Sequence, residues 1–589
     1  MSLRFMFRAP RITTLSLIAF ALAVRALYFV SIATGPLANQ HRWRENDMHF
    51  FDRWAREIAG GDWLTDRSLH PMLGWHLDLA ARTIEEHPEI ASRLPVEGGP
   101  EVRAERLWDI WYGGKTFHQE PFYPYLLGAT YFLLGPDPRW AMVLQLAAGV
   151  GTVLLVRAVA RRHFGEVVGA LAGFGAALCS PLLYYEGILL RDSLIALAGI
   201  ALVYLADAAL ARDTPRVWLL AGLAFGAAVA LKSTAALFLA AMACHSCIFW
   251  WRARKPLGAA LIRCAALGTG VALALAPAVL RNAAVGAPLC SLSSVGAVAF
   301  LFANVSDYDP EKGFSVSSEH APRILAKTDG RALPTVVETL RTHTPGSYVA
   351  QVLGKLASTW HWFEKPNNTS FYFYRLEAPV LRFLPITFGV MGPLSLVGLA
   401  LGLRRWREHV TLYLFIATTL GTMLLFYVLS RFRIHLVPAL IPFAALTVAR
   451  FFGALRGKRF IAAGAIAFAV LVAAAWIWRP LPAWRTPIRS VDYIVPQEVH
   501  YGPESKAALD GGDPARAARI LERSLRFQPP DVLELGPGTR AMDAQSAGLG
   551  RYYATIHDRY ALALERSGDP RGARKAAARA RELREACGP

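Results

Sequence analysis

Charged side chains recur at the ends of long apolar segments of this chain, and their types suit chemistry on a phosphate group. Arginine and lysine bind phosphate, arginine through paired hydrogen bonds. The candidate phosphate-binding cations are Arg191, Lys232, Arg431 and Arg433. A phosphate leaving group requires neutralisation of its charge, whereas an attacking hydroxyl requires a base, and a carboxylate can be that base. The pattern predicts transfer of a group from a phosphate to a hydroxyl at the edge of an apolar layer.

Asp47 is the candidate base. It lies near the start of residues 44–63, where apolar residues at helical spacing form one face, charged residues form the other, and two glycines end the helix. A short amphipathic helix directly after an apolar segment is typical of a helix lying in the membrane interface. Asp47 would then face both the membrane surface and the water. The alternative is that Asp47 or Asn46 only caps this helix, since both residue types favour that position.

Five further polar residues near the same segment ends are candidates for positioning the substrate. They are His118, Glu120, Glu186, Asp192 and Glu364. Charged groups at membrane depth are energetically costly, so a set of both signs on one side of the membrane indicates a function. Simpler interpretations stay open. Glu186 and Arg191 could pair with each other across a turn. Glu364 could serve only to order its loop, and His118 could have no role.

The composition indicates a membrane protein with many spans. The chain has 589 residues, 54% of them hydrophobic, and apolar runs near spanning length recur from residue 15 to residue 478. That pattern excludes a single soluble core. The net charge of +19 is spread over short clusters between the apolar runs, as the positive-inside rule produces, so it predicts no nucleic-acid partner. Six cysteines, mostly inside apolar runs, predict no disulfide framework.

The basic clusters also predict a topology. Arg4, Arg8 and Arg11 precede the first apolar run, which indicates an uncleaved span with a cytoplasmic N-terminus. The apolar run 122–134 is short, and treating it as interfacial sends the basic end of every later segment to the cytoplasm. We therefore predict an all-α polytopic membrane domain, residues 1–480, of about 11 transmembrane helices, with interfacial helices in the first outer loop. The expected outer, periplasmic loops are 35–138 and 281–380.

The sequence after residue 480 is hydrophilic, which predicts a second domain, 481–589, outside the membrane. Two of its segments, 507–519 and 562–574, each place Gly-Asp-Pro between two stretches rich in alanine and leucine. This arrangement is typical of a helix pair of the tetratricopeptide kind. We expect a small α-helical, repeat-like domain on the periplasmic side that recognises the acceptor or a partner protein.

Several short motifs occur in an order that resembles the GT-C superfamily of glycosyltransferases. Residues 47–63 resemble its acidic first-loop motif, and Glu120-Pro-Phe-Tyr-Pro124 resembles the proline motif that follows. Later landmarks are Ala276-Pro-Ala-Val-Leu-Arg-Asn282, Trp362-Phe-Glu-Lys-Pro-Asn-Asn368 and Ser430-Arg-Phe-Arg433. The resemblance covers residues 15–478. It is to protein O-mannosyltransferases and to bacterial phospholipid-carrier-dependent glycosyltransferases, including those that modify lipid A, a branch in which a tetratricopeptide-like tail is familiar. The insert 64–115 and the His-Gln-Glu before the proline depart from the family pattern.

The resemblance implies inverting transfer of a sugar from a polyprenyl-phosphate donor to an acceptor hydroxyl, with Asp47 as the catalytic acidic residue. The acceptor would be a protein or an envelope glycolipid at the periplasmic face of a bacterial inner membrane. No cofactor is expected beyond the lipid-linked donor, no metal site is assigned, and dependence on a divalent metal stays open.

Two other functions remain as alternatives. A polysaccharide polymerase or ligase would use lipid-linked glycans and place its key residues in the late outer loop, 281–380. A transporter of lipid-linked sugars would show repeated sets of spans and charges near the midplane, and the sequence shows neither.

Overall fold

The chain is helical throughout the part that the computed structural model describes, which is residues 10–95, 97–482, 486–536, 539–541 and 543–588. Within these ranges β-structure is limited to isolated bridges, so the all-α prediction is confirmed. Arg4 and Arg8, which we expect to lie in the cytoplasm, are outside the described residues. Contacts divide the chain into two units. The first takes in the described parts of Met1–Phe29, Glu45–Asn368 and Val380–Leu481.

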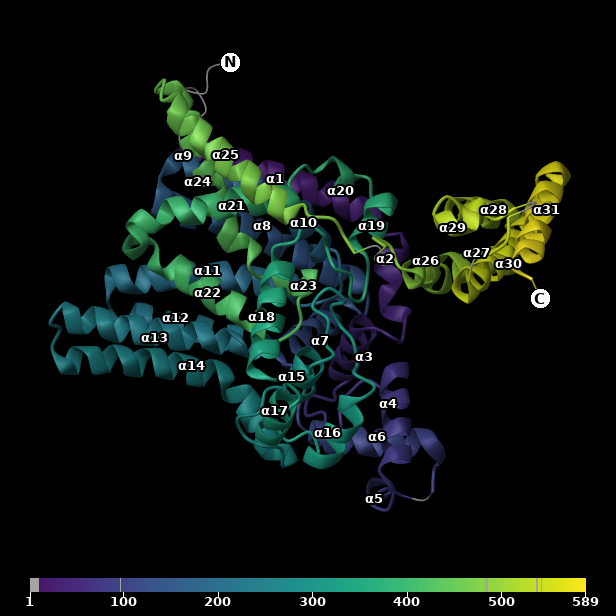
Figure 1. The fold of residues 1–589 in the computed structure, drawn as a ribbon, viewed down its shortest axis with the longest axis horizontal. Helices are drawn as coiled ribbons and strands as arrows, with labels where there is room; N and C mark the ends of the chain where they lie inside the picture. Colours follow the sequence, from purple (N-terminus) through teal and green to yellow (C-terminus); the bar gives the residue numbers. More distant parts are fainter. Residues whose placement is uncertain (1–9, 96, 483–485, 537–538, 542, 589) are drawn as a thin grey trace. The chain divides into compact units, whose positions relative to one another are not determined.

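Eight helical segments of the described chain are long and apolar enough to cross a membrane (Figure 1). They are α1 (Pro10–Ile32), α8 (Pro138–Phe164), α11 (Asp192–Arg212), α13 (Ala235–Arg252), α14 (Leu257–Val285), the joined segment Phe388–Leu425, α24 (Val437–Arg456) and α25 (Phe460–Ile477). Shorter apolar helices are α7 (Phe122–Leu134), α9 (Glu166–Ala177) and α12 (Pro215–Leu231). A polytopic membrane fold is therefore confirmed, while the count of about 11 spans stays a prediction.

Two apolar stretches of the chain are interrupted. The apolar stretch 167–185 is divided into α9 and α10 (Ser180–Glu186), because Cys179 is extended and the Ser180 N–H donates to the Ile386 carbonyl at 2.9 Å instead of to its own helix. The joined segment consists of α21 (Phe388–Gly402) and α22 (Val410–Leu425). Between them lies the 3₁₀ segment η2 (Leu403–His409), in which Arg405 leaves the helical conformation (φ −125°, ψ 34°).

Charged side chains form a layer at each end of the apolar helices. α11 begins at Asp192, in the cluster described below, and ends beyond Asp207. The Asp207 carboxylate lies 2.8 Å from His163 Nε2 and accepts a 2.6 Å hydrogen bond from the Thr411 hydroxyl. A helix of this length spans about 30 Å, which is the thickness of the hydrocarbon core of a bilayer. Asp192 and Asp207 are 15 residues apart, so about 22 Å of helix axis separates the two charged groups.

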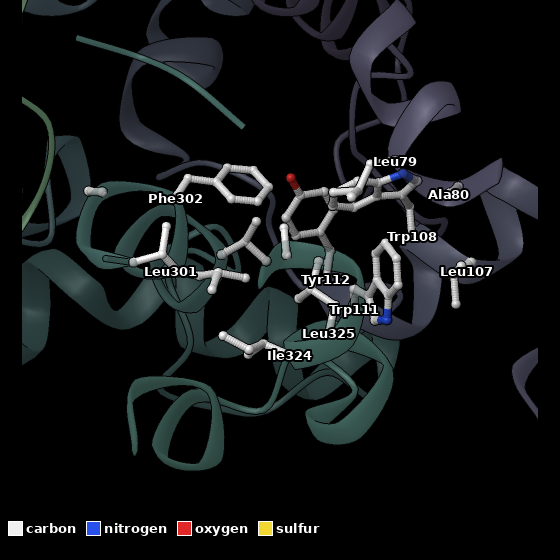
Figure 2. Packing of buried hydrophobic residues seen from close by; sticks show 14 of the residues in the cluster. Leu79, Ala80, Leu107, Trp108, Trp111, Tyr112, Leu301, Phe302, Ile324 and Leu325 are labelled. Atoms are coloured by element: carbon white, nitrogen blue, oxygen red, sulfur yellow. The ribbon is translucent and has the colours of Figure 1, made fainter. Parts of the chain in front are cut away.

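Two loops far apart in the sequence form one compact helical body, here called the loop lobe. The first loop contributes α4 (Gly74–Glu86), α5 (Pro88–Ala91) and α6 (Gly99–Tyr112), and the long loop contributes α15 (Gly296–Asn304), α16 (His320–Thr328) and α17 (Ala332–Leu340). Figure 2 shows Trp108 and Tyr112 of α6 in a shared core with Phe302 of α15 and Leu325 of α16. The insert 64–115 therefore provides nearly half of this core. In the long loop, α17 is followed by α18 (Pro345–Thr359).

The second unit consists of Val30–Arg44, Thr369–Pro379 and the described part of Pro482–Pro589. Its helices are α2 (Pro36–Asn39), η1 (Gln40–Arg42), α19 (Phe371–Glu377), α26 (Ser490–Pro496), the π-helical η3 (Gln497–Tyr501), α27 (Gly502–Asp510), α28 (Pro514–Leu525), α29 (Pro530–Glu534), α30 (Ala544–Arg566) and α31 (Pro570–Cys587). The short helix α20 (Val380–Phe383) belongs to the first unit.

The two Gly-Asp-Pro segments form the turns of two helix hairpins, α27–α28 and α30–α31. In each, the aspartate caps the second helix: Asp513 accepts from the Arg516 N–H and Asp569 from the Gly572 N–H, both at 2.9 Å. The tail also binds the 369–379 segment, where Glu377 accepts hydrogen bonds from the Tyr501 hydroxyl at 2.9 Å and from Arg523 at 2.5 Å. This unit thus takes in two short segments that precede residue 481.

Candidate functional site

Asp47 is the first residue of α3 (Asp47–Ala59), but the cap of this helix is Asn46, whose side chain accepts from the His49 N–H at 2.9 Å. The Asp47 carboxylate is left free to point elsewhere. Its Oδ2 accepts a 2.5 Å hydrogen bond from Arg431, on the short helix α23 (Ser430–Arg433), and a 3.2 Å bond from the Asn368 amide. Of the two residues expected as a possible cap, Asn46 is therefore confirmed as the cap and Asp47 is not.

The position of α3 depends on its packing against α7. The α3 apolar face presents Phe51, which contacts the Tyr123 ring edge-on at 5.1 Å between centroids, and Ile58, which packs on Gly128. A Cβ on Gly128 would lie 2.7 Å from the Ile58 side chain, so only glycine permits this approach of the two helices. The amphipathic pattern of 44–63 thus holds Asp47 by burying the apolar face along the length of the helix.

Arg431 bridges two carboxylates. Its Nη1 binds Asp47, and its Nε lies 3.6 Å from Oδ2 of Asp192, the first residue of α11. The other oxygen of Asp192 lies 2.9 Å from His435 Nε2. Burial alone would raise the pKa of Asp47, but the Arg431 guanidinium and the Asn368 amide stabilise the ionised form and hold the pKa below its usual range.

Glu120 is a third carboxylate beside these two and is 1% exposed. It accepts from Arg191 at 2.5 Å and from both the N–H and the hydroxyl of Ser233, at 2.8 and 2.7 Å. Lys232, at the end of α12, lies 3.8 Å away. Burial opposes ionisation of Glu120, but these cations outweigh it and lower its pKa. Lys232 and Arg431 both lie over the Phe432 ring, at 5.8 and 5.2 Å from its centroid, which joins the two groups.

We call these six residues the carboxylate–cation cluster. They are Asp47, Glu120, Asp192, Arg191, Lys232 and Arg431. Positive and negative side chains alternate through it, so the paired cluster has no large net charge. Lys232 is the most exposed of its cations, at 22% of the side chain against 4% for Arg191 and 6% for Arg431. An added anion would therefore meet Lys232 first.

His118 lies beside this cluster. Its ring contacts Phe50 and Tyr112 edge-on, with centroids 5.5 and 4.6 Å away, and burial lowers its pKa to about 3, so it is neutral. Its Nδ1 is buried without a hydrogen-bond partner in the described structure. A neutral, unpaired imidazole nitrogen can bind a hydroxyl group of a substrate.

Three of the predicted site residues lie in other ion pairs. Glu186 binds Arg25 of α1 at 2.6 Å, so its expected alternative pairing with Arg191 is wrong. Gly149 of α8 makes room for it, since a Cβ there would collide with the Glu186 carboxylate. Arg433 donates to the carbonyls of Thr359, His361 and Phe363 and binds Glu364 at 2.9 Å. The Arg433 guanidinium therefore holds the loop 359–364 in place, and its ion pair with the Glu364 carboxylate is one of these contacts.

Sequence reasoning missed several residues of the site. Asn368 is the last residue of the 362–368 motif, and the family resemblance of that motif could have identified it as a site residue. His435 follows Arg431 by one helical turn, but only the packing of α11 brings it to Asp192. Ser233 carries no signal beyond its position next to Lys232. In the described ranges no group of three histidine, cysteine, aspartate or glutamate side chains could hold a metal ion.

Comparisons with known proteins agree with the family resemblance over part of the chain. Residues 118–279 match the family model described as dolichyl-phosphate-mannose-protein mannosyltransferase. The match confirms the resemblance where it applies. It covers His118, Glu120, Arg191, Asp192 and Lys232, and it does not reach Asp47 or Arg431. No curated protein matches the sequence significantly.

Two kinds of solved structure align with this chain. The chain is 15% identical to ArnT from Cupriavidus metallidurans bound to undecaprenyl phosphate, with a TM-score of 0.41, covering 97% of this chain and 78% of that one. It is 13% identical to the Archaeoglobus fulgidus oligosaccharyltransferase in the apo form, with a TM-score of 0.40. That comparison covers 80% of this chain, which spans 57% of the length of the archaeal protein.

Proposed function

We propose that this chain is a membrane glycosyltransferase that transfers a sugar from a polyprenyl-phosphate donor to an acceptor hydroxyl. The family match over residues 118–279 supports the reaction class. The observation that carries the proposal is the carboxylate–cation cluster, in which a partly exposed Asp47 is held by Arg431 at one end of the apolar helices. Cations at a membrane surface suit a lipid phosphate, and a carboxylate beside them suits an attacking hydroxyl.

The donor phosphate binds the cations of the cluster. Lys232 is the first contact because it is the most exposed and the least tightly paired, at 3.8 Å from Glu120. Arg191 and Arg431 then share their guanidinium groups between the phosphate and the carboxylates that hold them. Glu120 and Asp192 keep these cations oriented before the donor binds, since each is almost fully buried and accepts charged hydrogen bonds.

Asp47 then acts as the base. The acceptor oxygen attacks the anomeric carbon, the bond from that carbon to the phosphate oxygen breaks, and the hydroxyl proton passes to the Asp47 carboxylate. Polyprenyl phosphate leaves, and the single displacement inverts the anomeric configuration. Arg431 couples the two substrates: a phosphate that draws Arg431 away removes the interaction that lowers the Asp47 pKa. The carboxylate becomes a stronger base when the donor is bound.

The other candidate residues of the site position the substrates or support the groups that react. His118 offers its unpaired Nδ1 to a substrate hydroxyl, and Asn368 orients the Asp47 carboxylate at 3.2 Å. Glu186, Glu364 and Arg433 support the helices and the loop around the site. We place the reaction at the periplasmic face of a bacterial inner membrane, with the acceptor a protein or an envelope glycolipid. The polymerase or ligase alternative would use the same donor chemistry, and the identity of the acceptor distinguishes it.

Asp47→Asn tests the assignment of the base. The amide is nearly isosteric but cannot take a proton, so we expect transfer to fall about 10²–10⁴-fold. Binding of polyprenyl phosphate should persist, because the Asp47 carboxylate no longer competes with the phosphate for Arg431. Asp78→Asn, at an exposed carboxylate on α4, is the matched control and should retain full activity. The measurements are turnover of a panel of polyprenyl-phosphate sugars by the purified protein and mass spectrometry of envelope glycolipids and proteins from a strain lacking the gene. Near-normal turnover by the Asp47 variant would refute this role.

A further inference from the structure

The loop lobe contains a cleft of about 470 Å³ that the proposed reaction does not use. Its walls come from the end of α6, the start of α15, the start of α17 and Phe426 at the end of α22. Both the first loop and the long loop therefore contribute to it. Its volume lies within the range of small-molecule sites, about 300–1,000 Å³.

Two residues that line the cleft carry buried polar atoms without partners. Among the described residues, nothing bonds to the indole Nε1 of Trp111, which is 2% exposed, or to the hydroxyl of Ser294. Buried donors of this kind are rare in native proteins, because each unpaired group costs about 1–3 kcal/mol. A ligand that accepts and donates hydrogen bonds would satisfy both.

The lining suits an uncharged ligand with both polar and apolar faces. Phe300 and Phe426 provide aromatic surface, and the serines provide hydroxyl groups. The lining contains one carboxylate, that of Asp329, which is neutralised by a two-point contact with Arg93 at 3.0 and 3.2 Å. Arg331 is the lone cation, so the cationic cluster that a phosphate requires is missing from this lining. Hydroxyl groups along an apolar ring face are the features of a sugar residue.

The cleft and the carboxylate–cation cluster lie on one continuous stretch of chain. Thr116 lines the cleft, and His118, two residues later, lies at the cluster. Two residues span at most about 7 Å. The cleft wall also holds this stretch in place: the Ser294 N–H donates to the Phe117 carbonyl at 2.8 Å, and the Ser293 hydroxyl donates to the His118 carbonyl at 2.9 Å. A ligand in the cleft would therefore lie close to His118, at the edge of the carboxylate–cation cluster.

We propose that this cleft binds an uncharged sugar residue of a glycan acceptor, adjacent to the residue that receives the transferred sugar. The inference rests on the proposed function and deepens it, since it makes the acceptor a glycan or glycolipid and not an unmodified protein. It also gives the insert 64–115 a role in acceptor choice, through Trp111 and its neighbours on α6.

Gly296 allows the cleft to be filled without disturbing the fold. It lines the cleft, is the first residue of α15, has no positive φ angle, and would have open space around an added Cβ. Gly296→Phe should therefore block the cleft. Gly346→Phe is the matched control, because Gly346 lies in the first turn of α18, also has open space around an added Cβ, and is outside the cleft.

The probes are the methyl glycosides of glucose, galactose, mannose and N-acetylglucosamine, with binding to the full chain in lipid nanodiscs measured by saturation-transfer NMR. We expect at least one to bind the wild type and Gly346→Phe, and none to bind Gly296→Phe. Ser294→Ala removes a hydroxyl that has no partner in the protein, so the change leaves no other group unpaired. It should weaken the binding of the glycoside roughly threefold to tenfold. It provides a second test if the larger substitution impairs folding.

Several results would overturn this proposal. They are the absence of binding by every glycoside to the wild type, equal binding to Gly296→Phe, or displacement of the glycoside by a serine- and threonine-containing peptide. Binding of polyprenyl phosphate, measured in the same nanodiscs, separates the two hypotheses. Its absence from the wild type would count against the proposed function, whereas loss of glycoside binding alone, with the lipid still bound, counts only against the cleft.

Discussion

Lys232 differs from the other cations of the carboxylate–cation cluster in how loosely it is held. It ends α12, lies 3.8 Å from Glu120, and has no closer carboxylate within the described residues. Burial lowers its pKa to about 8, and the repulsion of Arg191 and Arg431 adds to the effect against the attraction of Glu120. Its charge is therefore present below pH 8 and is lost as the pH rises through that value.

This titration predicts the pH dependence of donor binding. The probe is a polyprenyl methyl phosphate, a diester whose own charge does not change between pH 6 and 10. We expect its affinity to be constant below about pH 8 and to fall above it, by at most about tenfold per pH unit because one proton is involved. Lys232→Arg should remove this decline, since arginine stays charged, and Lys232→Met should weaken binding at every pH. A wild-type affinity that is flat up to pH 10 would exclude Lys232 as a phosphate ligand.

At the scale of elements, a buried hydrogen-bond relay connects three of the segments that carry the site. Gln145 of α8 is fully buried; its amide donates to the carbonyls of Glu186 and Ile188 at 3.1 and 2.6 Å, and it accepts from the Tyr123 hydroxyl of α7 at 2.8 Å. The two carbonyls belong to the turn that leads to Arg191. The proline-motif helix and the start of α11 are therefore held in one arrangement.

Gln145→Leu leaves two carbonyls and one hydroxyl unpaired, so we expect a lower melting temperature and a several-fold rise in the donor KM through displacement of Arg191. The acceptor KM should change little. Tyr123→Phe removes one donor and should have a smaller effect, and the double variant should be less than additive because the residues share one network. Ser246→Ala, at a buried hydroxyl of α13, is a control for stability alone. If the donor KM of the Gln145 variant equals that of this control, the relay is structural only.

At the scale of the whole molecule, the direction of α25 predicts the side of the membrane on which the tail begins. α25 starts after the basic residues 456–459, and its end lies beside the 359–365 loop, where Trp478 stacks on Trp362 with centroids 5.1 Å apart. Arg433 of the SRFR motif binds the same loop. The end of α25 therefore lies on the same side of the first unit as the carboxylate–cation cluster.

A reporter enzyme that is active only in the periplasm, fused after Pro589, should therefore be active. The same reporter fused at Arg407 should be inactive. Arg407 lies in η2, which connects the C-terminal end of α21 to the N-terminal end of α22, and we expect these two ends on the cytoplasmic side. Activity at Arg407 and none after Pro589 would reverse the proposed orientation, and activity at both would change the parity of the span count. Neither result depends on catalysis.

Local patterns in the sequence determine much of this architecture. Hydropathy identifies the long apolar helices, the amphipathic period of 44–63 identifies α3, and Gly-Asp-Pro identifies the two hairpin turns, because each signal lies within a few helical turns. Asp47, Glu120, Arg191, Lys232 and Arg431 could be selected because charged groups at the ends of apolar segments are rare and costly. The interruption at Cys179 could not be found in this way, since it depends on a hydrogen bond to Ile386.

Only the tertiary structure decides which charges meet. Asp47 and Arg431 are 384 residues apart, and Glu186 pairs with Arg25, 161 residues away, instead of with the nearby Arg191. Arg433 follows Arg431 by two residues, yet their guanidinium groups bind different partners because successive side chains on a helix point in different directions. Ion pairing depends on distances of a few ångströms between helices, and those distances are set by packing, such as that of Ile58 on Gly128, which no local pattern encodes.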